Sequence, residues 1–217
     1  MRKAFLVVLT AVLLLAPLTQ AQNALTTATA TDTISLPAPT TTGGMALTDA
    51  LAKRRSTRAF TATALTQPEI SQLFWAAQGI TDDKGHRTAP SARAKYYLTL
   101  YVATADGLFQ YLPEGHKLRK LNSTDLRSKL SPQPSVSAAP AVFIITGDYT
   151  RANDMPQAQR WVDLEAGHAT QNLLLQATAL NLAGVSAGGI DPAEIMKIAS
   201  LPKSSEPIYL VPIGHTK

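Results

Sequence analysis

Residues 96–103 read Tyr-Tyr-Leu-Thr-Leu-Tyr-Val-Ala, and a second strand-like run, residues 107–112, follows the pair Asp106-Gly107. Runs rich in aromatic and β-branched residues indicate strands, and an Asp-Gly pair between two of them favours a hairpin turn. A hairpin requires antiparallel pairing. This stretch therefore predicts a sheet that is not of the all-parallel kind.

Helix signals lie on both sides of the hairpin. Thr66 and Glu69 have the spacing of a capping box, and Gly79 can end the helix that they begin. Near the C-terminus Asp191 serves as an N-cap before Pro192. The helices expected are residues 46–54, 66–79, 157–182 and 192–200, and the apolar half of the longest, 172–182, is expected to be buried.

Two continuous apolar runs, residues 140–146 and 207–213, are typical of strands covered on both faces. Because helices and strands interleave while the hairpin is antiparallel, the pattern favours an α+β fold over a doubly wound parallel one. The expected architecture is a mostly antiparallel central sheet with helices packed on it.

The N-terminal segment resembles a secretory signal peptide. Arg2 and Lys3 precede an apolar run from Phe5 to Leu18, and Thr19-Gln20-Ala21 has the small-x-small pattern of a cleavage site. The run is short for a membrane span. Residues 1–21 are therefore predicted to be a Sec-like signal peptide and the mature protein to be exported, periplasmic or secreted, without stable membrane insertion. The alternative is a retained anchor.

Residues 22–45 are rich in Thr and Ala and are predicted to be a flexible segment, which leaves residues 46–217 as one domain. The formal net charge is +5 for all 217 residues and +3 without the two cations of the signal peptide. This mild basicity, with no aromatic-interleaved basic stripe, predicts no nucleic-acid binding. The chain has no cysteine, which excludes thiol nucleophiles and Cys-ligated metals.

Residues 54–58 read Arg-Arg-Ser-Thr-Arg, which places three guanidinium groups and two hydroxyls after a predicted helix. Arginine forks bind phosphate in bidentate geometry, and a serine hydroxyl can donate one further hydrogen bond. The cluster predicts a site for a phosphorylated ligand. The alternative is that arginines at the end of a helix offset the negative end of its dipole.

Four segments in the same order resemble the FMN-dependent nitroreductase superfamily across residues 46–214. They are Arg54–Phe60, the helix residues Leu73–Gly79, the loop Arg87–Ala92, and Gly167 with Gln171–Leu175. Residues 75–79 and 90–92 are most similar to the branch that includes the SagB-type azoline-oxidising dehydrogenases.

The resemblance implies a nitroreductase-like fold and a bound FMN in a homodimer whose two sites lie at the subunit interface. It implies that the FMN phosphate and ribityl chain are bound by Arg54, Arg55, Ser56 and Arg58. It implies that two further segments approach the flavin ring, namely Pro90, Ser91 and Ala92, and Ala187, Gly188 and Gly189. The catalytic residues stay unknown, since in such enzymes the flavin carries the chemistry.

Two departures from the pattern bear on function. Relatives often place a flavin-contacting asparagine three residues after the serine of the Pro-Ser segment, where this chain has Ala94. Many relatives also carry a basic residue beyond the last strand to bind the phosphate, and Lys217 could serve that purpose here. These features support an alternative, a non-catalytic flavin- or ligand-binding protein on the same scaffold.

Other chemistry is weakly represented. The four histidines lack metal-ligand spacing, Ser91 lacks a nucleophile elbow, and Asp163 and Glu165 are two residues apart on a helix and so do not face one another. No metal site is predicted. The expected function is an exported FMN-dependent oxidoreductase acting on a small organic molecule, with either NAD(P)H or an organic compound as the electron donor.

Overall fold

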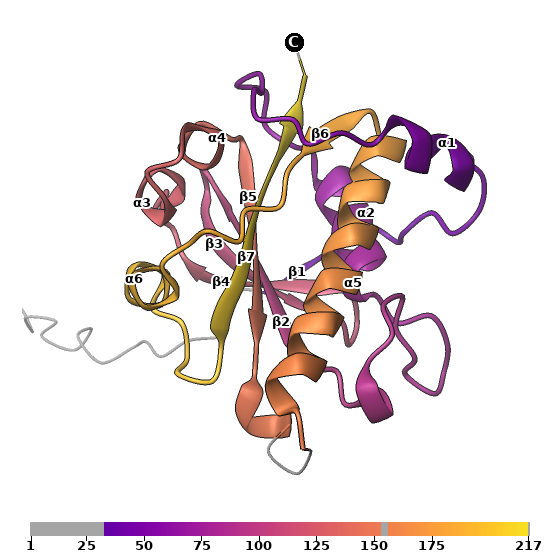
Figure 1. Cartoon of the computed structure of the whole chain (residues 1–217). Coiled ribbons are helices and arrows are strands. Elements are labelled where there is room, and N and C mark those ends of the chain that lie inside the picture. Colours follow the sequence, from indigo (N-terminus) through magenta and orange to yellow (C-terminus); the bar gives the residue numbers. More distant parts are fainter. Residues whose placement is uncertain (1–32, 153–155, 217) are drawn as a thin grey trace, which may run out of the picture. The chain divides into compact units, whose positions relative to one another are not determined.

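A seven-stranded antiparallel sheet forms the centre of the protein in the computed structural model, which describes residues 33–152 and 156–216 (Figure 1). The strand order is β1-β4-β3-β2-β5-β7-β6, and every neighbouring pair is antiparallel. The strands are β1 (Thr33–Ser35), β2 (Leu98–Thr104), β3 (Gly107–Leu112), β4 (Lys117–Asn122), β5 (Ala141–Gly147), β6 (Leu182–Gly184) and β7 (Glu206–His215). The predicted antiparallel α+β architecture is confirmed.

Helices cover both faces of this sheet (Figure 1). Those of four or more residues are α1 (Leu47–Lys53), α2 (Gln67–Gln78), α3 (Arg127–Leu130), α4 (Pro134–Ser137), α5 (Ala158–Ala179) and α6 (Pro192–Ala199), with the 3₁₀ turns η1 (Ala92–Ala94) and η2 (Tyr149–Ala152). Side chains of α2 and α5 share one hydrophobic core, and those of α3, α4 and α6 share the other.

Strand β5 separates the two cores. Phe143 and Ile145 pack into the core under α2 and α5, whereas Val142 and Ile144 pack into the opposite core. Successive side chains of a strand point to opposite faces, so a strand covered on both faces must be apolar throughout. The continuous apolar run predicted this burial correctly.

The hairpin and the helix caps form where the sequence places them. In the hairpin, Val102 of β2 pairs with Phe109 of β3. Gly107 has a φ of 126°, and a Cβ at this position would lie 2.1 Å from the Asn122 carbonyl oxygen on β4, so only glycine fits. The Thr66 hydroxyl accepts the Glu69 N–H in a reciprocal capping box at the start of α2.

The longest helix is shorter than predicted. Helix α5 ends at Ala179, Asn181 takes a left-handed φ of 57°, and Leu182 begins β6 by pairing with His215. In its second half Leu173, Leu174 and Ala177 are buried, whereas Leu175 is only half-buried. The prediction of a fully buried segment over 172–182 is wrong in this respect.

The described part of the predicted flexible segment belongs to the domain. Ile34 of β1 pairs with Leu118 of β4, and Leu36 is buried. The Thr40 N–H donates to the Gln72 Oε1 atom at 2.8 Å, and the Gln72 amide donates back to the Thr40 carbonyl at 3.0 Å. The domain therefore begins before residue 46, where the sequence analysis placed its boundary.

Residues 1–32, which include the predicted signal peptide, lie outside the described residues. Among the helices of the described ranges, none has the length and apolar character needed to cross a membrane.

Candidate functional site

The backbone of the arginine cluster is held by helix α1 and strand β6. Arg54 caps α1 with its N–H, which donates to the Ala50 carbonyl at 2.9 Å. Ser56 forms a parallel bridge with Gly184, and the Thr57 N–H donates to the Gly184 carbonyl at 3.1 Å. The segment thus runs along the edge of β6 with its side chains at the surface.

The three arginines divide into two roles. The Arg55 guanidinium donates to the carbonyls of Ala52 and Arg54 at 2.9 and 2.8 Å, so the helix-end interpretation holds for this residue. Within residues 33–152 and 156–216, the side chains of Arg54 and Arg58 donate no hydrogen bond to the protein, and neither does the Ser56 hydroxyl. Arg58 and Ser56 are exposed, and Arg54 is half-buried. These donors are available to an anion.

Segment 187–189 begins three residues after Gly184, the β6 residue that contacts Ser56 and Thr57 of the cluster. Ala187 and Leu210 exchange two backbone hydrogen bonds of 2.8 and 3.0 Å, which fix the segment against β7. Gly188 and Gly189 are exposed. Their N–H groups have no acceptor among the described residues, and a Cβ on Gly189 would meet nothing within 4 Å. Packing does not require glycine at 189, and its absent side chain leaves the backbone open to a ligand.

The loop 90–92 lies at a different place, beside the first half of α5. Pro90 is exposed, whereas Ser91 and Ala92 are half-buried. The Ser91 hydroxyl donates to the Glu165 Oε2 atom at 2.5 Å and accepts the Tyr96 N–H at 2.8 Å. The Ser91 side chain therefore faces the protein, and what the loop presents outward is its backbone and Pro90.

Glu165 is a buried carboxylate with 1% of its surface exposed. It also accepts the Tyr97 N–H and the Gln78 side-chain amide, each at 3.3 Å. Burial raises its pKa above the ordinary value, while the hydrogen bond from Ser91, the other donors and the charge of Arg87 act in the opposite direction. Glu165 is thus a buried hydrogen-bond acceptor that ties the loop to α5.

The turn that follows Ser91 has an unusual backbone. Arg93, Ala94 and Tyr96 have φ values of 54°, 52° and 51°, in the left-handed region that residues other than glycine rarely adopt. The Arg151 guanidinium donates to the carbonyls of Tyr96 and Lys95 at 3.0 and 2.7 Å. Left-handed residues cluster at functional sites when the surrounding structure holds them there.

The three predicted segments do not all meet within one chain. Arg55 and Thr57 line the same surface depression as Thr178 and Asn181, at the C-terminal end of α5. Ser91 is bonded to Glu165, which precedes Thr178 by thirteen residues, about 20 Å along a helix that rises 1.5 Å per residue. Figure 1 shows α1 beside the end of α5 that leads into β6. The arginine cluster contacts Gly184, three residues before segment 187–189, whereas Ser91 is bonded to α5 about 20 Å along the helix from the end that borders the cluster.

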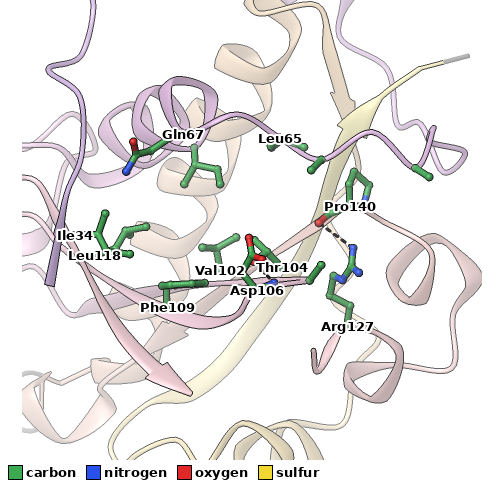
Figure 2. Close-up of a pocket in the computed structure, with 14 residues that line it drawn as sticks. Ile34, Leu65, Gln67, Val102, Thr104, Asp106, Phe109, Leu118, Arg127 and Pro140 are labelled. Atoms are coloured by element: carbon green, nitrogen blue, oxygen red, sulfur yellow. Dashed lines mark hydrogen bonds between the residues drawn. The ribbon is translucent and has the colours of Figure 1, made fainter. Parts of the chain in front are cut away.

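A cavity of about 320 Å³ lies elsewhere, between the sheet and the start of α2 (Figure 2). Its walls include Ile34, Leu65, Val102 and Phe109, and its polar groups include Arg127. The Arg127 guanidinium is already engaged by the Asp125 carboxylate and by the carbonyls of Ala139 and Pro140. None of the ten predicted flavin-binding residues lines this cavity.

Two of the four histidines form side-chain hydrogen bonds within the described protein. His86 pairs with Asp82 at 2.6 Å, and His116 bridges the Ser71 hydroxyl and the Tyr111 hydroxyl at 2.7 and 2.9 Å. No group of three or more acidic, histidine or cysteine side chains within the described ranges could hold a metal ion. Lys217, considered above as a phosphate ligand, lies outside the described residues.

Comparison with known proteins gives this geometry its context. A model of the nitroreductase family matches residues 51–215. The chain belongs to the nitroreductase family. A protein of Methanocaldococcus jannaschii that carries the name nitroreductase is 35% identical over 181 residues, which cover 78% of this chain and 90% of that protein. Family membership makes the protein an oxidoreductase of the nitroreductase type.

Solved structures agree. A crystal structure of a protein from Ralstonia eutropha, also named a nitroreductase, superposes with a TM-score of 0.81 at 32% identity and covers 85% of this chain and 90% of its own. The NADPH:FMN oxidoreductase from Vibrio harveyi in complex with NAD⁺ has a TM-score of 0.60 at 20% identity, with 79% and 69% coverage. The second likeness shows the shared nitroreductase-like fold alone.

Sequence reasoning missed the importance of Glu165. It considered Glu165 only as an acid/base partner for Asp163 and correctly found that the two do not face one another. The overlooked signal was position: Val162, Ala166, Ala169 and Leu173 form the buried stripe of α5, and Glu165 lies on it at helical spacing. A lone carboxylate on an apolar stripe predicts a buried partner, and Ser91 is that partner.

Proposed function

We propose that this nitroreductase-family protein is an exported FMN-dependent oxidoreductase whose two sites each combine residues of two identical chains. The observation that carries the proposal is the set of unengaged donors beside β6: the Arg54 and Arg58 guanidinium groups, the Ser56 hydroxyl and the N–H groups of Gly188 and Gly189. A flavin mononucleotide has a phosphate at one end and a ring with acceptor atoms at the other, so it matches both halves of this set.

Arg54, Arg58 and Ser56 would hold the phosphate. Charge-assisted hydrogen bonds to a phosphate are short and roughly twice as strong as neutral ones, and arginine supplies them in pairs. Arg55 contributes less in this proposal because its guanidinium already donates to two carbonyls at the end of α1. Its positive charge would still favour an anion nearby.

Segment 187–189 would lie beside the ring. Ala187 is fixed to β7 by two backbone hydrogen bonds, and the two glycines that follow expose their N–H groups without side chains in the way. A rigidly held backbone donor at a ring nitrogen is one of the means by which a protein tunes a flavin. The residues present therefore fit FMN at both ends.

A second copy of the chain would complete the site. The loop 90–92 is distant from the arginine cluster of its own chain, so it would reach a flavin only across a dimer interface. Exposed apolar side chains support such an interface: Leu47 and Leu51 on α1 are 65% and 53% exposed, and Trp161 and Leu164 on α5 are 37% and 44% exposed. Large apolar side chains on neighbouring helices are typical of surfaces that bind another subunit.

Bound flavin would supply hydride or electron transfer between a donor and a small organic acceptor. The protein's share is to bind the phosphate, to place the ring against 187–189 and to cover it with the loop of the second chain. Because NAD(P)H is scarce outside the cytoplasm, we expect an organic donor or an electron-transfer partner. The similarity to the SagB-type branch is compatible with direct oxidation of an organic substrate.

The second candidate is a flavin-binding protein without turnover. Ala94, exposed on the strained turn, has no polar side chain to contact a flavin where many relatives have asparagine. Reduction by dithionite followed by reoxidation with a quinone or a nitroaromatic compound separates the two candidates. An enzyme turns over repeatedly, whereas a binding protein does not.

The test of the proposal is the visible spectrum of the purified mature protein together with its mass in solution. We expect flavin absorption, release of FMN and not FAD on denaturation, and a dimer by light scattering. Protein that stays colourless after incubation with FMN contradicts the cofactor assignment. A flavin-loaded monomer contradicts the two-chain site and leaves the cofactor assignment standing.

A further inference from the structure

Three separate segments donate hydrogen bonds to the buried carboxylate of Glu165. Gln78 comes from the last residue of α2, Ser91 from the loop, and Tyr97 from the residue before β2. These segments are far apart in the sequence from Glu165, and each of them donates a hydrogen bond to its carboxylate. Glu165 therefore occupies the centre of the region that carries the loop 90–92.

The direction of each hydrogen bond can be assigned. The Ser91 oxygen accepts the Tyr96 N–H, so its one hydrogen points to Glu165. The Arg87 Nη1 atom donates to the Gln78 Oε1 atom at 3.2 Å, so the Gln78 amide nitrogen faces Glu165. Every contact of the carboxylate is thus a donor, and the ionised form satisfies all of them.

The loop held in this way is strained. Three residues between 93 and 96 are left-handed, and a left-handed conformation costs about 1–2 kcal/mol for a residue with a Cβ. Such strain persists only where surrounding contacts over-determine the backbone. Here the Ser91 hydroxyl accepts the Tyr96 N–H, and the Glu165 carboxylate accepts the Tyr97 N–H. The Arg151 guanidinium donates to the carbonyls of Tyr96 and Lys95.

Burial of this charge does not serve stability. Because burial raises the pKa of Glu165, the ionised form is less favourable in the folded protein than in water. A neutral side chain of similar shape would avoid that cost. The benefit of the carboxylate must then be geometric, since only an all-acceptor group accommodates three converging donors.

We propose that Glu165 is the positioning residue of the flavin-facing loop, and that its carboxylate fixes the turn 91–97 in the one conformation that presents residues 90–92 to the ring bound by the second chain. The inference rests on the proposed function for its second half. The first half, that Glu165 fixes the turn, stands without flavin.

The decisive experiment uses paired amide variants. In Glu165→Gln, the new amide nitrogen faces the Gln78 amide nitrogen, and rotating the Gln78 amide only moves the conflict to Arg87. In the double variant Gln78→Glu with Glu165→Gln, residue 78 accepts hydrogen bonds from both residue 165 and Arg87. Every hydrogen bond is therefore restored, and the negative charge lies on residue 78 in place of residue 165. Asp163→Asn, which changes an exposed carboxylate on the same helix, is the matched control.

The first readout is amide hydrogen exchange at Tyr96 and Tyr97 in flavin-free protein. We expect Glu165→Gln to speed exchange at these two amides about tenfold, since a hydrogen bond to a charged group is lost or weakened. Exchange at Ile144 in β5 should not change. The double variant should restore slow exchange, and Asp163→Asn should leave it unchanged. Unchanged exchange in Glu165→Gln, or equal acceleration throughout the protein, overturns the inference.

The second readout is the dissociation constant for FMN, measured by fluorescence quenching. We expect a rise of about tenfold in Glu165→Gln and recovery in the double variant. If exchange responds but affinity does not, the turn is held by Glu165 and the link to the ligand is overturned. If the wild-type protein binds no FMN, the proposed function fails while the exchange result still decides whether Glu165 fixes the turn.

Discussion

Arginines lie in the cluster at 54–58 and around the turn at 91–97, and the two regions use them in opposite ways. In the cluster, the backbone is fixed by β6 and the outer guanidinium groups have no partner among the described residues. Around the turn, Arg87 and Arg151 donate hydrogen bonds to groups of the protein, and the backbone of the turn is strained. The outer arginines of the first region leave their donors unengaged by the described protein, whereas those around the second use their donors to hold its backbone.

The difference shows that residue type alone does not identify a binding residue. Arginine at 54 or 58 has spare donors, whereas arginine at 151 has its fork occupied by two carbonyls. A ligand with a phosphate would gain from the first kind and would have to displace existing hydrogen bonds at the second. The affinity of the protein for an anion should therefore depend on a few positions only.

The largest effect is expected when both outer arginines are removed. Loss of one charge-assisted phosphate contact costs about 1.5–3 kcal/mol, so Arg54→Ala with Arg58→Ala should weaken FMN binding by at least about a hundredfold. Thermal unfolding of the flavin-free protein should change little because neither side chain bonds to the described protein. Fluorescence titration measures the affinity, and differential scanning calorimetry measures the unfolding.

Arg55→Ala is the matched control for that pair. Its guanidinium serves the helix end, so we expect a slightly lower unfolding temperature and a smaller loss of FMN affinity than for either neighbour. If all three substitutions weaken binding equally, the division of roles among the arginines is wrong.

A mixing experiment tests whether the two regions act across a dimer. One chain carries Arg54→Ala and Arg58→Ala, and the other carries Pro90→Trp, a change at an exposed position of the loop. Each alone should retain no flavin at limiting FMN. After unfolding and refolding together, random pairing should restore about a quarter of the sites, because half of the dimers are mixed and each has one intact site. No restoration means that both regions serve the flavin of their own chain.

The contrast also limits what sequence could reveal. The hairpin, both capped helices and the two buried strands were predictable because their signals are local: an Asp-Gly turn, Thr66 with Glu69, and continuous apolar runs. Strands β1, β4 and β6 were missed. Residues 117–122 are mostly polar, and only Leu118 is buried, so pairing through the backbone left little trace in the side-chain pattern.

The candidate site was predictable in parts and not as a whole. The arginines are adjacent in sequence and so were visible as a cluster. The bond between Ser91 and Glu165 joins residues 74 positions apart. The separation of Ser91 from Arg54 depends on where each packs along α5, and no local pattern encodes that packing.

A pH titration can probe the buried anion that holds the turn. The pKa of Glu165 is raised in the folded state, so the folded protein binds more protons than the unfolded chain between the ordinary value of 4.5 and the raised value. The buried charge therefore lowers the free energy of unfolding by its full amount above the raised pKa, and this loss disappears as the pH falls toward 4.5. Wild-type protein should gain stability relative to Glu165→Gln as the pH falls through this window.

Urea unfolding of both proteins at a series of pH values measures this difference. The groups near the carboxylate are the neutral donors Ser91 and Gln78 and the cation Arg87, which pairs with Glu114. Arg87→Gln, which removes the cation, should raise the pKa of Glu165 further and widen the window. A difference that is constant with pH contradicts the buried-charge account.

The smallest effect concerns the strained backbone itself. Ala94 has a φ of 52°, and its left-handed conformation costs about 1–2 kcal/mol that glycine does not incur. Glycine in turn increases the entropy of the unfolded chain, which costs about 0.5–1 kcal/mol relative to alanine. The two effects oppose each other, and Ala94→Gly should raise the free energy of unfolding by about 0.5–1 kcal/mol. At Ala105, an exposed turn residue without a positive φ, the same change should lower stability because only the entropic cost applies. Urea unfolding of the two variants measures the difference. If Ala94→Gly destabilises the protein as much as Ala105→Gly does, the turn is not strained, and the contacts around it are not needed to maintain a strained backbone.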